Sequence, residues 1–160
     1  LTGARVAVIP QRCVLEAEQF ARTLCRHGVT MMYMSVGLFN QYTGALASVF
    51  SRLRYLLIGG DSLEPGAIRR VLRLSPPQHL LNAYGPTECT TFATTHLIES
   101  VDDGAAGIPI GRPMANAQIY ILDRRGQPAP LGVTGEIPAI AVGTGVKLSR
   151  FQAHSSDPPC

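Results

Sequence analysis

A turn near the middle of the chain carries a hydroxyl and a carboxylate next to each other. The run Asn82–Tyr84 passes through Gly85-Pro86 into Thr87 and Glu88. Glycine lets backbone approach a ligand closely, a hydroxyl can donate to a phosphate oxygen, and a carboxylate can hold Mg²⁺. The tyrosine offers a flat face to a purine ring, and the asparagine can pair with a base edge. These residue types predict half of an ATP site, although an ordinary solvated turn has the same spacing.

The elements before this turn alternate between strand and helix. Short apolar runs at 5–9, 29–34, 54–58 and 80–84 predict strands, and we expect the run at 29–34 to be covered on both faces. Helical spacing marks 15–27, with one apolar face, and 36–50. A third helix is expected after Ser62, which can cap it, and extends to about residue 74. This order predicts an α/β fold with a mostly parallel sheet.

Ligands of such sheets bind beyond the carboxyl ends of the strands. Two glycine turns stand at such ends, Gly59-Gly60-Asp61 and Gly85–Glu88, and they could be neighbours. The second half of the chain is β-rich instead. We expect a β-rich run at 90–98, a strand at 117–122 closed by a turn at 123–126, and a last strand at 136–142 that Pro138 weakens. From Ser149 onward the sequence has no periodicity and is predicted to be a tail.

Composition excludes several classes of function. The 160 residues are 46% hydrophobic and only 16% charged, which suits a piece buried in a larger protein. The net charge of +3 includes no basic block, so nucleic acid is not expected as a partner. No apolar run reaches the roughly 18–20 residues that span a bilayer. The first ten residues do not have the pattern of a secretion signal, and the four cysteines lack zinc spacing. We therefore expect a cytoplasmic protein whose sequence, lacking an initial Met, begins within a longer chain.

The motif Asn82–Glu88 resembles the signature of the adenylate-forming, AMP-binding enzymes, and more specifically the adenylation domains of non-ribosomal peptide synthetases. Other stretches resemble that family in the same order, and the likeness covers about residues 1–137. They are Val29-Thr30 to Leu38–Gln41, Leu57–Leu63, Ile108–Pro113, Asn116 with Tyr120–Asp123, and Gln127–Glu136. The resemblance implies a fragment of the large N-terminal subdomain of such an enzyme.

The resemblance also implies a role for each site residue. Tyr84 would stack on adenine, Asn82 would bond its exocyclic amine, and the Gly59-Gly60 backbone would line the other side of the base. Thr87 would contact the α-phosphate, and Glu88 would hold Mg²⁺. The pocket for the substrate side chain would map to Tyr33, Leu57, Gly59, Ala83, Thr91 and Phe92, with the Gly85 carbonyl facing the substrate amino group. Core packing explains the apolar members of this pocket equally well.

The implied reaction joins an amino acid, expected to be uncharged, to ATP, giving aminoacyl-AMP and pyrophosphate. Positioning and neutralisation of phosphate charge would carry the catalysis. The aminoacyl group then passes to a phosphopantetheine thiol. The implied partners are the carrier (thiolation) and condensation domains of the parent synthetase.

The chain departs from the family pattern in ways that bear on activity. A phosphate-binding loop with Lys, an acidic anchor for the substrate amine, a ribose-binding Asp and a catalytic Lys are all absent from these 160 residues. Residues 138–160 lose the family likeness, as a frameshifted or disordered tail would. We therefore expect the isolated chain not to catalyse adenylation. An inert fragment that keeps the fold is the alternative.

Other motifs are weaker. Gly60–Leu63 matches the nucleophile block of GDSL esterases, with Ser62 as nucleophile, but Phe151 stands where the family has Asp, three residues before His154. Gly143–Lys147 has the wrong spacing for a phosphate loop. The remaining histidines, His27, His79 and His96, are scattered among different elements.

Overall fold

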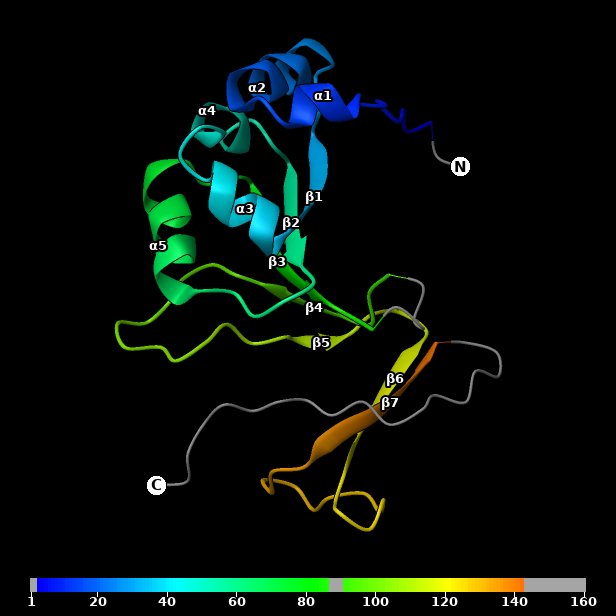
Figure 1. The fold of residues 1–160 in the computed structure, drawn as a ribbon. Coiled ribbons are helices and arrows are strands. Elements are labelled where there is room, and N and C mark those ends of the chain that lie inside the picture. Colours follow the sequence, from blue (N-terminus) through cyan, green and yellow to red (C-terminus); the bar gives the residue numbers. More distant parts are fainter. Residues whose placement is uncertain (1–2, 87–90, 143–160) are drawn as a thin grey trace. The chain divides into compact units, whose positions relative to one another are not determined.

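The computed structural model describes residues 3–86 and 91–142, with side chains followed to residue 137. These residues divide into two compact units. The first takes the chain up to Ala83 together with His96–Gly111, and the second takes Tyr84–Thr95 and the chain from Arg112 onward. The hydrogen-bonded order of the larger sheet is β1-β2-β3-β4-β5, and β6 and β7 form a separate pair. Figure 1 shows the elements along the chain.

Three parallel strands form the centre of the first unit. They are β1 (Met31–Ser35), β2 (Tyr55–Gly59) and β3 (His79–Tyr84). Tyr33 pairs in register with Leu57, and Gly59 pairs with Ala83. The chain passes from β1 to β2 and from β2 to β3 through helical crossovers, as predicted, because parallel neighbours cannot be joined by a tight turn.

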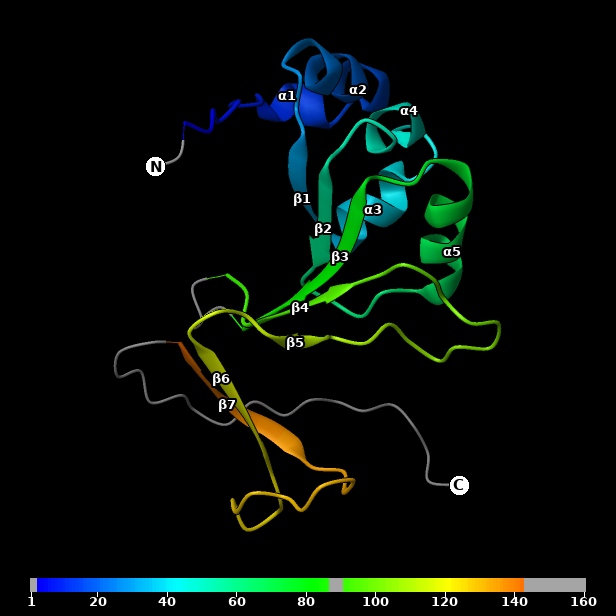
Figure 2. The same ribbon diagram turned by 180° about the vertical axis from the view of Figure 1, so that it is seen from behind.

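Helices cover one face of these strands. Figures 1 and 2 show α3 (Val36–Tyr42), α4 (Ala47–Phe50) and α5 (Pro65–Leu74) together on one side of the sheet. The core between the two layers contains the largest fully buried side chains, among them Phe39, Phe50, Met34, Leu56 and Ile58. The opposite face is open, since Met31 and Tyr33 are 61% and 46% exposed. The prediction that 29–34 is covered on both faces is therefore wrong for the described chain.

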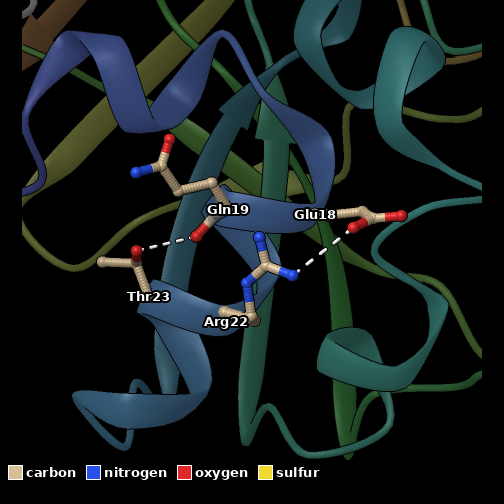
Figure 3. Close-up of polar contacts among 4 residues, drawn as sticks. All are labelled: Glu18, Gln19, Arg22 and Thr23. Atoms are coloured by element: carbon tan, nitrogen blue, oxygen red, sulfur yellow. Dashed lines mark hydrogen bonds and ion pairs between the residues drawn. The ribbon is translucent and has the colours of Figure 1, made fainter.

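The first helices, α1 (Gln11–Val14) and α2 (Ala17–Arg26), lie beside the start of β1. The predicted apolar stripe of α2 is confirmed, because Phe20 and Leu24 are buried in the core. Its outer face is solvated and carries the contacts drawn in Figure 3. Arg22 forms an ion pair of 3.4 Å with Glu18 one turn earlier, and the Thr23 hydroxyl donates to the Gln19 carbonyl at 2.7 Å.

Two predicted elements differ from the structure. Residues 5–9 form no strand, and Val6 and Val8 are 86% and 84% exposed. A β-branched run becomes a strand only when a neighbouring strand supplies a ladder, and none of the described residues does so here. The predicted helix 36–50 is broken into α3 and α4 by a turn at 43–46, which contains Gly44.

The cap of α5 also differs from the prediction. Glu64, not Ser62, precedes the first helical residue, Pro65, and its carboxylate accepts from the backbone N–H groups of Gly66 and Ala67. Glutamate can reach these donors because it stands directly at the N-cap position. The two backbone hydrogen bonds hold the pKa of the Glu64 carboxyl below its ordinary value. The Ser62 N–H instead donates to the Asp61 carboxylate at 2.7 Å.

The second unit is made of antiparallel pairs. In it β4 (Thr94–Leu97) pairs with β5 (Arg112–Pro113) through Thr94 and Thr95. The predicted strands β6 (Ala117–Leu122) and β7 (Glu136–Val142) are confirmed with their bounds and pair with each other. The turn after β6 is closed by a bond of 2.9 Å from Gly126 N–H to the Asp123 carbonyl. No helix in the described parts of the chain is long and apolar enough to cross a membrane.

Candidate functional site

Four of the predicted pocket residues lie on the open face of the first unit's sheet. Tyr33 and Leu57 are paired across β1 and β2, and two residues further along Gly59 and Ala83 are paired across β2 and β3. Residues in register on parallel strands project to the same side, and so do residues two apart. The structure therefore brings Tyr33, Leu57, Gly59 and Ala83 together near the carboxyl ends of the strands.

The backbone of this patch leaves no room for a side chain at Gly59. A Cβ atom there would overlap the carbonyl oxygen of Ala83, which is backbone and cannot swing away. The Tyr33 ring covers the same segment, because its Cε2 atom lies 3.6 Å from the Gly59 Cβ position and its hydroxyl 3.4 Å from that of Gly60. Gly60 has a φ of 89°, which favours glycine. Close strand packing thus explains Gly59 without any substrate.

Asn82 lies between these residues in sequence but faces the other way. It is in register with Ile58, one of the buried residues on the helix-covered side. Its side chain is 4% exposed, and the amide Nδ2 donates to the carbonyl oxygens of Pro109 at 2.9 Å and Ile108 at 3.4 Å. Sequence reasoning missed these two carbonyls. The family-like stretch Ile108–Pro113 was visible, but nothing in it indicated which backbone atoms are used.

The second unit holds the other described site residues. The Tyr84 carbonyl accepts a hydrogen bond of 2.8 Å from Ala93 N–H, which closes the turn. A Cβ atom on Gly85 would stand 2.7 Å from the Phe92 Cα atom and 2.9 Å from the Thr91 carbonyl oxygen. Position 85 must therefore be glycine, because the backbone of residues 91–93 passes too close to it to admit a side chain. Thr91 is exposed, and Tyr84 and Phe92 are half-buried.

The residues predicted to meet phosphate and metal, Thr87 and Glu88, lie outside the described residues. Their roles stay predictions. Within residues 3–86 and 91–142, His, Cys, Asp and Glu side chains form no group of three or more that could hold a metal ion.

Two hollows of the first unit lie around α5. One of about 450 Å³ is lined by Asn40, Glu64 and Arg70, among others. Another of about 600 Å³ is lined by Arg69, Arg70 and Arg73 together with the chain at 99–103. Neither includes a residue predicted for nucleotide or substrate.

The esterase alternative finds no support at Ser62. The Ser62 hydroxyl lies 3.5 Å from the Asp61 carboxylate, and among the described residues no histidine contacts it. His154, the base that this alternative would need, lies outside the described part of the chain. Ser62 is neither a helix cap nor part of a described triad.

Comparison with known proteins agrees with this geometry. Residues 1–140 match the family model of the AMP-binding enzymes. The chain is 40% identical over 143 residues to surfactin synthase subunit 2 of Bacillus subtilis (strain 168). The aligned region covers 89% of this chain and 4% of that protein. It is 37% identical over 147 residues to malpibaldin synthetase of Mortierella alpina, covering 89% of this chain and 3% of the relative.

A solved structure supports the same relationship. PA1221, an NRPS protein containing adenylation and PCP domains, superposes with a TM-score of 0.66 at 34% identity, over 76% of this chain and 25% of the other. The α/β fold is that of the large N-terminal subdomain of adenylate-forming enzymes, as predicted. The chain spans a small part of each of these proteins. On the family match over residues 1–140, this chain belongs to the AMP-binding enzyme family.

Proposed function

We propose that the chain is a segment of an adenylation domain that activates an amino acid for non-ribosomal peptide synthesis. The reaction would join the amino acid to ATP, release pyrophosphate and pass the aminoacyl group to a carrier-bound phosphopantetheine thiol. Similarity to surfactin synthase subunit 2 and to the adenylation and PCP protein PA1221 supports this assignment. Carrier and condensation domains of the parent synthetase would be the partners, in the cytoplasm.

One structural observation carries the proposal. Gly59 and Ala83 are paired in register, so the glycine turn after β2 and the turn after β3 leave the sheet at the same edge. This edge is where α/β sheets bind ligands. Two sequence motifs that the family resemblance assigns to one nucleotide site thus begin from adjacent strand ends.

Each residue has a proposed role. Asn82 and Tyr84 would bind adenine, with the Gly59-Gly60 backbone along the base. The Asn82 side chain fits this role, since both described amide contacts use Nδ2 and leave Oδ1 as an acceptor for an exocyclic amine. Thr87 would contact the α-phosphate. Glu88 would hold Mg²⁺, which would neutralise phosphate charge when bound.

The substrate side chain would meet the patch of Tyr33, Leu57, Gly59 and Ala83, in which Tyr33 is exposed and Ala83 is buried, with Thr91 and Phe92 as further pocket residues. The Gly85 carbonyl would accept from the substrate amino group. The described members of this pocket carry no formal charge, so an uncharged amino acid is the proposed substrate. We further propose that residues 138–160 form a divergent tail, outside the adenylation segment at 1–137.

Calorimetric titration with Mg·ATP and with a non-hydrolysable aminoacyl-adenylate analogue tests the proposal. Measurable affinity that Tyr84→Ala and Glu88→Gln each reduce at least tenfold would support it. Tyr120→Ala and Glu99→Gln are matched controls, because both residues are exposed and neither belongs to the proposed site. Absence of binding, or equal losses in the controls, would favour the alternative that the chain keeps the fold but has no function of its own.

A further inference from the structure

The loop between β4 and β5 contains an aspartate that is followed directly by glycine. Asp103-Gly104 is the only place in the sequence where glycine follows an aspartate or an asparagine. Both residues are exposed, and Figures 1 and 2 show the loop running out past α5 before it turns back. Backbone at exposed loop tips is the part of a fold that rearranges most easily. This pair is therefore open to solvent in the folded chain.

The pair occupies the centre of a tight turn. The Ala105 N–H donates to the Asp102 carbonyl at 3.2 Å and closes the turn around Asp103 and Gly104. Gly104 has a φ of 88°, the left-handed value that the third position of a type II turn requires. A Cβ atom on Gly104 would meet nothing within 4 Å, so the described chain leaves open space beside it. An exposed turn of this kind opens at a small cost in free energy.

The Asp103 carboxylate is not held by the rest of the fold. Among the described residues it forms no hydrogen bond and no ion pair. The Asp123 carboxylate, at the turn after β6, instead accepts from two backbone N–H groups at 2.8 and 2.9 Å. The residues after Asp123 and Asp61 also carry a Cβ atom, which crowds the backbone nitrogen, whereas Gly104 carries none. Asp103 is therefore the aspartate best able to approach the nitrogen that follows it.

We propose that Asp103 is a site of spontaneous isoaspartate formation. The Gly104 backbone nitrogen attacks the Asp103 Cγ atom. An N–Cγ bond forms, a Cγ–O bond breaks, and the oxygen leaves as water with the amide proton and one proton from solvent. Water then adds to the succinimide ring at the former main-chain carbonyl and breaks its bond to the Gly104 nitrogen. The chain now runs through the Asp103 side chain, and its mass is unchanged.

The modification would change the backbone next to an anchor of the first unit. The Asp102 carbonyl accepts a hydrogen bond of 2.8 Å from the Arg69 guanidinium of α5, in addition to the one from Ala105. Isoaspartate adds one methylene group to the main chain between residues 103 and 104. The enlarged turn no longer has the four-residue geometry that the Ala105 bond closes. The loop should therefore become looser at Asp102, where α5 holds it.

Ageing the whole 160-residue chain at neutral pH and physiological temperature tests the proposal. Isoaspartate is measured as methyl groups transferred by an isoaspartyl methyltransferase, and electron-transfer fragmentation locates it in the sequence. We expect it to accumulate severalfold faster at Asp103 than at Asp61, Asp102 or Asp123. Asp103→Asn should form it severalfold faster still, because an amide closes the same ring with loss of ammonia. Asp103→Glu should abolish it at this position, because the longer side chain would have to close a larger ring.

Asp102→Glu is the matched control, because it changes an exposed neighbouring acid that is not followed by glycine. It should leave the isoaspartate at Asp103 at the wild-type level. Accumulation no faster at Asp103 than at the other three aspartates, or none at any of them, would overturn the proposal. Hydrogen exchange of the Ala105 N–H should be faster in the aged chain, and unchanged exchange would contradict the loosening of the loop. None of these results depends on nucleotide binding, so the proposed function is tested separately.

Discussion

The carbonyl oxygen of Ala83 stands where a Cβ atom of Gly59 would have to be. The two residues are register partners on β2 and β3. The close approach belongs to the parallel sheet itself, and it brings the backbone of one predicted motif against that of the other. Gly59 is therefore explained by packing, because the Ala83 carbonyl oxygen fills the position that a side chain would need.

Gly59→Ala should lower the free energy of unfolding by about 1–3 kcal/mol, because the added methyl forces two strands apart. Urea denaturation of the chain measures this. Gly37→Ala is the matched control, since a Cβ there meets nothing within 4 Å and the residue lies inside α3. It should raise the free energy of unfolding by up to about 1 kcal/mol. Equal effects of the two substitutions would contradict the packing explanation.

Truncation of two phenylalanines should separate core from pocket. Phe50 has no exposed surface and stacks on Phe39, with ring centroids 6.0 Å apart. Phe50→Ala should therefore cost about 3–5 kcal/mol of stability. Phe92 is half-buried, so Phe92→Ala should destabilise less and change the affinity for the adenylate analogue instead. The prediction is wrong if Phe92→Ala costs as much stability as Phe50→Ala and leaves that affinity unchanged.

The Glu64 cap of α5 should make the stability of the folded chain depend on pH. The pKa of Glu64 is lowered in the folded chain by the Gly66 and Ala67 N–H groups. A lowered folded pKa gives stability that is present above the ordinary pKa and is lost as the pH falls through the folded one. Glu64→Gln should lower the melting temperature near neutral pH, and the difference from wild type should shrink below about pH 4. Glu16→Gln, at a cap position without a side-chain bond, should show no such trend.

The ion pair of α2 should contribute almost nothing. Arg22 and Glu18 are 73% and 87% exposed and one helical turn apart. Such pairs are screened by solvent, so Glu18→Gln should change the free energy of unfolding by less than about 0.5 kcal/mol. Denaturation at low and high salt checks this, and a larger loss that salt abolishes would show that the pair matters.

The isolated 160-residue chain should show no ATP–pyrophosphate exchange. The resemblance assigns the β- and γ-phosphates to a loop with Lys and the chemistry to a further Lys, and neither is among these residues. Nucleotide could bind at Asn82 and Tyr84 without turnover. The purified chain would be assayed with a mixture of amino acids, and Tyr84→Ala prepared in parallel would expose a contaminating enzyme. Exchange that Tyr84→Ala abolishes would overturn this prediction.

Much of the fold follows from short-range patterns in the sequence. The helix at 65–74 and the strands at 117–122 and 136–142 were predictable because their ends carry breakers such as Pro65 and Gly126. For Gly59 and Ala83, the sequence predicted only that the two strands could end next to each other. It did not predict that these residues are register partners, because register is set by packing in three dimensions.

Other features depend on partners that a linear pattern does not name. Residues 5–9 have the composition of a strand, but no described strand offers them a ladder. Glu64 took the cap position from Ser62 because the helix begins at Pro65, two residues later than a Ser62 cap requires. The carbonyls of Ile108 and Pro109 are backbone atoms, so residue identity does not mark them.

The regular spacing of the parallel strands has a consequence for folding kinetics. Tyr55 follows its partner Met31 by 24 residues, and His79 follows Tyr55 by 24. Closing either loop thus carries a similar entropic penalty, since that penalty depends on loop length. Neither strand pair is favoured by a shorter connecting loop, and β2 is a member of both pairs. Slow, non-local pairing of this kind sets the rate of folding, so the central strand is where a nucleus of the first unit would form.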